Sequence, residues 1–250
     1  MCILFLAVQE HPDYPLIICA NRDEFHQRAT KSAHFWPQNP NMLAGQDLQE
    51  GGSWLGINKK GFFAAITNIR TGSKVSPDKQ SRGELVTMAL AETSQINHQW
   101  LQAHCQQYNP FNLVYGPLNE LRCFNSTTGV ETVLSKGFHA ISNGSLDDVW
   151  PKMAKGEQQL EALVKSNKKV KAKKLLMILK DQSRPEAHQL PDTGIPLQWE
   201  LLLSSIFIAS PDYGTRSSSI ILQKKQGSIK FHEVEYDRKG EELNHRVFKT

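Results

Sequence analysis

Apolar residues in the first third of the chain come in short runs, which predict β-strands rather than helices. Residues 1–8 form a nearly continuous apolar run and residues 16–20 form another, so we expect the chain to open as a hairpin of buried strands. Residues 51–58 and 61–68 repeat this pattern around a two-residue connection, Lys59-Lys60. A connection of that length favours a second β-hairpin.

Two polar, proline-bearing stretches interrupt the pattern. Residues 26–41 contain Pro37 and Pro40, and residues 183–199 contain Pro185, Pro191 and Pro196. Proline fixes φ and removes a backbone donor, so stretches of this kind usually lie outside helices and strands. We therefore expect a loop in each place.

Helical spacing of apolar residues occurs in two pairs of segments, with short strands around them. The expected helices are 81–91, 95–107, 150–164 and 171–180, and the expected further strands are 112–116, 121–124, 131–134, 138–142, 204–209, 218–223, 228–236 and 246–249. Hairpins that alternate with helix pairs do not make the βαβ units of a parallel sheet. They predict an α+β fold, a four-layer αββα sandwich of two mostly antiparallel sheets, in a single domain over residues 1–250.

Composition narrows the function classes. The chain has 250 residues, 39% of them hydrophobic, and a net charge of +4 with a basic run at Lys165 and Lys168–Lys174. The run is expected to be the solvated start of a helix, and because no aromatic stacking set accompanies it, nucleic-acid binding is not indicated. The apolar N-terminal run lacks a basic region and a cleavage site, and no later run is long enough to span a membrane. We expect a cytoplasmic protein without stable membrane insertion.

Four cysteines, Cys2, Cys19, Cys105 and Cys123, are scattered without metal-binding spacing. Neither a zinc site nor a disulfide framework is indicated, and no metal is expected. Cys2 stands apart, because removal of Met1 would give it a free α-amine. With a pKa of about 8, that amine could take the proton of the thiol. A retained methionine would block it, and a cysteine in an apolar strand is more often a core residue.

The chain also carries a set of short polar motifs. They are Asn21-Arg22-Asp23-Glu24, Gly51-Gly52-Ser53-Trp54-Leu55-Gly56, Ala65-Ile66-Thr67-Asn68, Ser81-Arg82-Gly83-Glu84-Leu85-Val86, Asn112-Leu113, Ile141-Ser142-Asn143 with Trp150-Pro151-Lys152, and Tyr213-Gly214-Thr215-Arg216-Ser217-Ser218. In this order they resemble the motifs of the NRDE family, also known as the transport and Golgi organisation protein 2 family. The resemblance covers essentially the whole chain.

The layout with a cysteine at position 2 also resembles the N-terminal nucleophile (Ntn) hydrolases, in particular the choloylglycine hydrolase and penicillin V acylase branch. By this resemblance the site residues are Cys2 as nucleophile, Arg22 at the end of the second strand, Asn68 and Asn143 at two strand ends, and Arg216. Asp23, directly after Arg22, is a further candidate, because its carboxylate could orient the α-amine. The acylase pattern has an aspartate three residues after the arginine, where this chain has Phe25. The group that orients the α-amine therefore differs.

Two functions follow from these resemblances. The NRDE family implies a haem- or acyl-handling role, and we place haem trafficking, with haem as cargo, first. Cys2 thiolate is one candidate iron ligand, and Arg22 or Arg216 could pair with the propionates. The alternative is an amidohydrolase or acyltransferase that cleaves a non-peptide C–N amide bond and needs no cofactor. Either way the expected partner is a small-molecule ligand, haem or an acylated amide. A lone histidine such as His34, His139 or His232 is more often a surface or satisfied core residue than a ligand.

Overall fold

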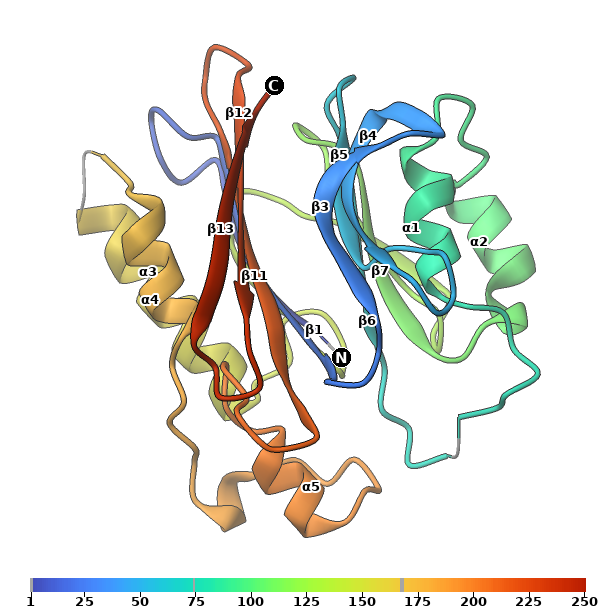
Figure 1. Ribbon diagram of the computed structural model, residues 1–250, viewed down its shortest axis with the longest axis vertical. Helices are drawn as coiled ribbons and strands as arrows, with labels where there is room; N and C mark the ends of the chain where they lie inside the picture. The colour runs from blue at the N-terminus through green and yellow to red at the C-terminus, as the bar shows by residue number, and fades with distance from the viewer. Residues whose placement is uncertain (1, 74, 167–168) are drawn as a thin grey trace. The chain divides into compact units, whose positions relative to one another are not determined.

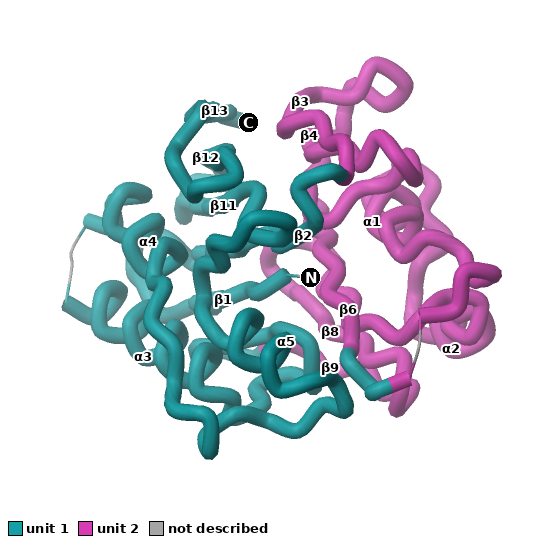
Figure 2. The backbone as a smooth tube through the Cα atoms, turned by 60° about the horizontal axis from the view of Figure 1, so that its bottom comes forward, with its two compact units in different colours: residues 1–27, 70–72, 135–250 teal, residues 28–69, 73–134 magenta. Residues whose placement is uncertain are grey.

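The computed structural model describes residues 2–73, 75–166 and 169–250, so expectations about Met1 and Lys168 lie outside the described residues. The chain divides into two compact units, which Figure 2 colours separately. The first comprises residues 1–27, 70–72 and 135–250, and the second comprises residues 28–69 and 73–134. The single domain expected over residues 1–250 stays a prediction.

The first unit is a six-stranded sheet with a helix pair along one face (Figure 1). Its strands, in spatial order, are β10 (Gly137–Ile141), β1 (Cys2–Val8), β2 (Leu16–Phe25), β11 (Tyr213–Gln223), β12 (Ile229–Tyr236) and β13 (Glu242–Lys249). The helices are α3 (Pro151–Ser166) and α4 (Ala172–Leu179). Every pairing in this sheet is antiparallel. The opening hairpin is thus confirmed, and β1 and β2 are inner strands.

Alternation along β1 decides which side chains face the helices. Ile3, Phe5 and Ala7 belong to the core that α3 and α4 complete, so Cys2 points to the opposite face of the sheet. Gly156 on α3 lets the helix approach closely, since a Cβ there would lie 2.1 Å from Cζ of Phe5. The strand that begins with Cys2 is therefore held against α3 by close packing.

The second unit is a seven-stranded antiparallel meander with two helices on one face. Its elements are β3 (Thr30–Trp36), β4 (Asn39–Asp47), β5 (Leu55–Asn58), β6 (Phe62–Asn68), α1 (Gly83–Leu90), α2 (His98–His104) with a 3₁₀ turn (Cys105–Gln107), β7 (Phe111–Pro117), β8 (Arg122–Asn125) and β9 (Val130–Val133). The second hairpin, both helix pairs and the α+β class with two antiparallel sheets are confirmed.

The loop expected at residues 26–41 is wrong, because β3 and the start of β4 form a hairpin there. The prolines misled the prediction. Pro37 lies in the turn between the two strands, and Pro40 is exposed in β4. Trp36 is buried and its Nε1 donates to the carbonyl oxygen of Ala44 at 3.0 Å, which fixes the hairpin through a tertiary contact.

The strand expected at residues 204–209 is also wrong. This apolar stretch is buried but irregular, and isolated hydrogen bonds rather than a ladder hold its backbone. Asn21 Nδ2 donates to the carbonyl oxygen of Ile206, and the amide of Ile208 donates to Thr215 Oγ1. The loop expected at 183–199 is interrupted by a 3₁₀ helix, Ala187–Gln189, and leads into α5 (Leu197–Leu202).

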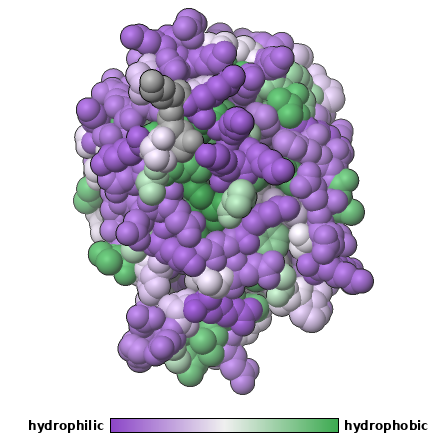
Figure 3. Space-filling view, turned by 90° about the vertical axis from the view of Figure 1, so that its left-hand side faces the viewer, coloured by the Kyte–Doolittle hydropathy of each residue, from purple (hydrophilic) through white to green (hydrophobic). Residues whose placement is uncertain are grey.

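The basic run lies where it was expected. Lys171 precedes α4, and Lys173 and Lys174 are exposed on it. The surface over α3 and α4 is largely hydrophilic in Figure 3, which agrees with a solvated helix face. The four cysteines are buried, and none of them is part of a disulfide. No helix in the described part of the chain is long and apolar enough to cross a membrane.

Candidate active site

The β1–β2 register places Cys2 directly opposite Arg22. Directly opposed residues of an antiparallel pair share a face, with Cβ atoms about 5 Å apart. Both side chains are buried, and both point to the sheet face away from α3 and α4. A thiol and a guanidinium are therefore neighbours, although 19 residues separate them in sequence.

Asp23 is buried and firmly held. Thr215 Oγ1 donates to Asp23 Oδ1 at 2.7 Å, and Tyr213 Oη donates to the backbone oxygen of Asp23 at 3.0 Å. Thr215 is in turn fixed through Ile208, whose carbonyl oxygen accepts from the amide of Thr215 at 2.8 Å. The irregular segment around Ile208 thus serves to orient the residue that follows Arg22.

Asn143 follows β10 and lies beside the start of β1. Ser142 Oγ is 3.3 Å from the backbone oxygen of Cys2 and 3.3 Å from Asn143 Oδ1, so the hydroxyl can donate a hydrogen bond to either oxygen. Arg70 contacts Asn143 twice: its amide donates to the backbone oxygen at 2.8 Å, and its Nη2 is 3.4 Å from Oδ1. With donors at Oδ1, the Nδ2 donor of Asn143 is turned toward other acceptors.

Arg216 occupies a β-bulge between Thr215 and Ser217, where the β2–β11 register shifts. Its guanidinium donates to the backbone oxygens of Phe25 and His26 at 3.0 and 3.2 Å. Burial lowers the pKa of Arg216, and the positive charge of Arg22 lowers it further. The two guanidiniums are thus close enough to repel each other at the end of β2.

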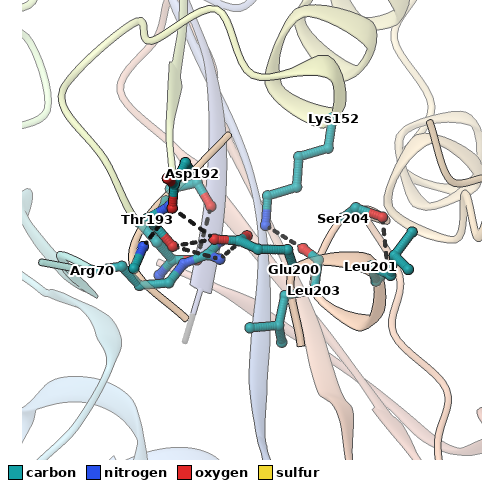
Figure 4. A network of polar contacts seen from close by, with 11 residues as sticks. Arg70, Lys152, Asp192, Thr193, Glu200, Leu201, Leu203 and Ser204 are labelled. Atoms are coloured by element: carbon teal, nitrogen blue, oxygen red, sulfur yellow. Dashed lines mark hydrogen bonds and ion pairs between the residues drawn. The ribbon is translucent and has the colours of Figure 1, made fainter. Parts of the chain in front are cut away.

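Arg70 lies in a network of buried charges (Figure 4). Its Nη1 is 2.7 Å from Glu200 Oε2, and the two side chains are 9% and 5% exposed. The amide of Thr193 donates to the other oxygen of Glu200, and the guanidinium lies 4.9 Å from the centre of the Trp150 ring. The guanidinium that contacts Asn143 is therefore fixed on three sides.

Lys152 is a buried amine in the same network (Figure 4). Its Nζ donates to the carbonyl oxygen of Leu203 at 2.9 Å. Burial lowers the pKa of Lys152 to about 8, the charge of Arg70 contributes to the lowering, and Asp23 and Glu200 oppose it. Lys152 is thus electrostatically coupled both to the Arg70–Glu200 pair and to Asp23.

The electrostatics of Cys2 and Asp23 oppose spontaneous ionisation. Burial raises the pKa of the Cys2 thiol, the negative charge of Asp23 raises it further, and the positive charge of Arg22 works against that rise. Burial also raises the pKa of Asp23, while the hydrogen bond from Thr215 and the charge of Lys152 lower it. A mainly protonated thiol needs a base to become a nucleophile.

The first unit therefore brings together Cys2, Arg22, Asp23 and Asn143, with Arg216 at the neighbouring bulge. Asn68 ends β6 in the second unit, opposite Phe111, and its role stays a prediction. Sequence reasoning missed Arg70, Lys152 and Glu200. Lys152 was visible as part of the Trp150-Pro151-Lys152 motif, whereas Arg70 and Glu200 are 130 residues apart and meet only in the fold.

The arrangement offers a nucleophile, a guanidinium beside it, a fixed carboxylate and an oriented amide donor. These are the groups that acyl transfer through a covalent intermediate needs. Among residues 2–73, 75–166 and 169–250, no group of three or more His, Cys, Asp or Glu side chains could hold a metal ion.

Comparison with solved structures shows the fold to be that of the Ntn hydrolases. Penicillin V acylase from Agrobacterium tumefaciens has a TM-score of 0.56 and 12% identity, with 99% of this chain and 85% of that chain covered. A mutant of the conjugated bile acid hydrolase from Clostridium perfringens has a TM-score of 0.54 and 10% identity, with 100% and 92% covered. At such low identity the likeness speaks for the fold alone.

Comparison with curated sequences shows the family. Transport and Golgi organization protein 2 homologs from Homo sapiens and Bos taurus are 34% and 33% identical, over 93% of this chain and 92% of each relative. The Drosophila melanogaster protein is 30% identical over 93% of this chain and 91% of its own. The family model, Transport and Golgi organisation 2, matches residues 1–238. The chain belongs to the Transport and Golgi organisation 2 family.

Proposed function

We propose that the protein is an N-terminal-cysteine amide hydrolase or acyltransferase that acts on a small-molecule amide. The observation that carries this is the pairing of Cys2 with Arg22 at the start of an inner strand, with Asn143 held beside it. Two structures with the same fold are named penicillin V acylase and conjugated bile acid hydrolase. Those names describe amide-cleaving proteins, and they support the same reaction class here.

The proposed reaction has two steps and requires that Met1 be removed. In the first, Cys2 Sγ adds to the amide carbonyl carbon and its proton passes to the α-amine of Cys2. Asn143 Nδ2 donates to the carbonyl oxygen as negative charge develops on it. The C–N bond then breaks, the ammonium returns its proton to the departing amine, and a thioester remains on Cys2.

In the second step a nucleophile attacks the thioester. Water, deprotonated by the α-amine, adds to the carbonyl carbon, and breakage of the C–S bond releases the acid and restores the thiol. Another amine or thiol in place of water would make the reaction an acyl transfer. Arg22 assists both steps, because its positive charge favours the thiolate form of Cys2. That form attacks the amide in the first step and leaves the thioester in the second.

Hydrolysis of aliphatic p-nitroanilides of increasing chain length tests the proposal. Released nitroaniline is followed by absorbance, with wild type compared against Cys2→Ser and Cys2→Ala. Both variants should lose turnover while retaining the fold. Asn143→Ala should lower kcat by about 10²- to 10³-fold, the effect of removing one oxyanion donor. Equal turnover in wild type and Cys2→Ala would refute the proposal.

Haem carriage is a second candidate, favoured by the two guanidiniums near Cys2. Arg22 and Arg216 repel each other, so a dianionic ligand such as a haem with two propionates would relieve that repulsion. Titration of the purified protein with haem should then give a saturable Soret change, weakened about tenfold or more in Arg216→Gln. A Soret change that does not saturate would remove this candidate.

A further inference from the structure

Ser217 is a buried hydroxyl that the proposed reaction does not use. It is 5% exposed, and its Oγ has no hydrogen-bond partner among the described residues. Ser218, the next residue, differs: its Oγ donates to Asn21 Oδ1 and accepts from Tyr236 Oη. A buried hydroxyl without a partner costs free energy, so in native proteins a ligand or a water usually satisfies it.

The sheet register places Ser217 in one row with the candidate nucleophile. Ser217 is directly opposite Arg22, which is directly opposite Cys2. All three side chains therefore lie on the same face, the one opposite α3 and α4. Neighbouring strands are about 4.8 Å apart, so Ser217 lies about 10 Å from Cys2 along the row, with Arg22 midway.

The charges along this row favour an anion at its centre. Arg22 is directly opposite Ser217, and Arg216 precedes Ser217 in the bulge, where its guanidinium donates to the backbone oxygens of Phe25 and His26. Glu24 lies on the same face as Arg22, two residues further along β2, and its negative charge acts on Arg216. Glu235 continues the row beyond Ser217, but its carboxylate is paired with Arg246. A ligand group between Cys2 and Ser217 would therefore face the Arg22 guanidinium and a hydroxyl donor, which together suit a carboxylate.

We propose that Arg22 and Ser217 form a subsite for an anionic group of the substrate, so that the preferred substrate is an amide with a carboxylate on its amine side. The carboxylate would accept from Ser217 Oγ and from the Arg22 guanidinium while the amide carbonyl lies at Cys2 Sγ. The position of the amide carbonyl at Cys2 Sγ rests on the proposed function. Ser217 is then a specificity-determining residue.

Alkylation of Cys2 by a matched pair of probes tests the subsite without requiring turnover. N-bromoacetylglycine carries a carboxylate about 5 Å from the reactive carbon, and its carboxamide is the neutral counterpart. In each case Cys2 sulfur displaces bromide, and intact mass with peptide mapping gives the rate at Cys2 alone.

The quantity compared is the ratio of the anionic to the neutral rate in wild type, Ser217→Ala, Ser217→Thr and Ser219→Ala. Ser219→Ala is the matched control, because it removes a buried hydroxyl from the same face one row away.

Ser217→Ala should lower the ratio about tenfold, the size expected for one hydrogen bond to a charged group. Ser217→Thr, which keeps the hydroxyl, should restore it, and Ser219→Ala should leave it unchanged. An unaltered ratio in Ser217→Ala would mean that the hydroxyl holds a water only, and the subsite would be rejected. Failure of both probes to label Cys2 in wild type would reject it as well. Absence of p-nitroanilide hydrolysis would count against the proposed function. The ratio of the anionic to the neutral alkylation rate would still test the subsite.

Discussion

Cys2 and Arg22 lie directly opposite each other in the β1–β2 pair. The positive charge of Arg22 lowers the pKa of the Cys2 thiol, against the larger effect of burial. The negative charge of Asp23 raises the same pKa, so the reactivity of the thiol depends on the opposing charges of Arg22 and Asp23.

Replacing Arg22 by glutamine should therefore raise the pKa of Cys2 further. The rate of Cys2 alkylation by neutral iodoacetamide rises with the thiolate fraction, so its pH profile should shift to higher pH in Arg22→Gln. Arg184→Gln, which removes an exposed arginine of the same unit, should leave the profile unchanged. A shift of equal size in both variants would mean that net charge, not the Cys2–Arg22 pairing, sets the thiol's pKa.

Lys152 should make stability depend on pH in the alkaline range. Its folded pKa of about 8 lies below the ordinary value of 10.5, so the unfolded state binds more protons between these values. The free energy of unfolding should then rise with pH from about 8 to 10.5, by about 3 kcal/mol from this group.

Lys152→Met removes that contribution, and urea unfolding of both proteins at several pH values isolates it. From pH 7 to 10.5 the stability difference between the two should move in favour of wild type. Parallel pH profiles for wild type and Lys152→Met would show that the buried amine does not titrate as expected.

The Arg70–Glu200 ion pair should show strong coupling. Removing one partner of a buried pair leaves an uncompensated charge, so Arg70→Met and Glu200→Gln should each cost about 3 kcal/mol of unfolding free energy. The double variant should cost clearly less than the sum, as measured by denaturant unfolding in a double-mutant cycle. Additive costs would mean that the two side chains act independently.

Gly156 should be intolerant of a larger side chain. The Cβ of alanine would lie 2.1 Å from the Phe5 ring, so α3 or β1 must shift, at a cost of about 1 to 3 kcal/mol. Phe5→Leu in the same chain should recover part of that loss. If Gly156→Ala is as stable as wild type, close packing of α3 on β1 is not what holds the start of the chain.

Local sequence pattern predicted the hairpins and helices but not the elements that depend on distant contacts. The β3–β4 hairpin was hidden by Pro37 and Pro40, and it forms because Trp36 reaches the backbone of Ala44. Residues 204–209 are apolar enough for a strand, yet Asn21 and Thr215 bind their backbone instead. These bonds depend on where single side chains point in the fold, and the Asn21–Ile206 bond joins residues 185 apart in sequence, so periodicity cannot reveal them.

The candidate site was predictable to a similar extent. Cys2 and Arg22 follow from the hairpin, since the antiparallel register that pairs Val8 with Leu16 also pairs Cys2 with Arg22. Arg70 and Glu200 carry no pattern of their own, because an arginine or glutamate near a loop is usually solvated. Ser217 differs from Ser218 only in the face to which its side chain points, and the bulge at Arg216 sets that face.

Intact-mass measurement of an acyl adduct tests the central claim most directly. The protein is first weighed to establish whether Met1 is removed, then incubated with excess p-nitroanilide and quenched in acid within the first turnover. For chains that begin at Cys2, we predict a single added acyl group, mapped to Cys2 and missing in Cys2→Ala. Chains that keep Met1 should remain unmodified. An adduct of the same yield in Cys2→Ala, or none on chains that begin at Cys2, would contradict the assignment of Cys2 as an N-terminal nucleophile.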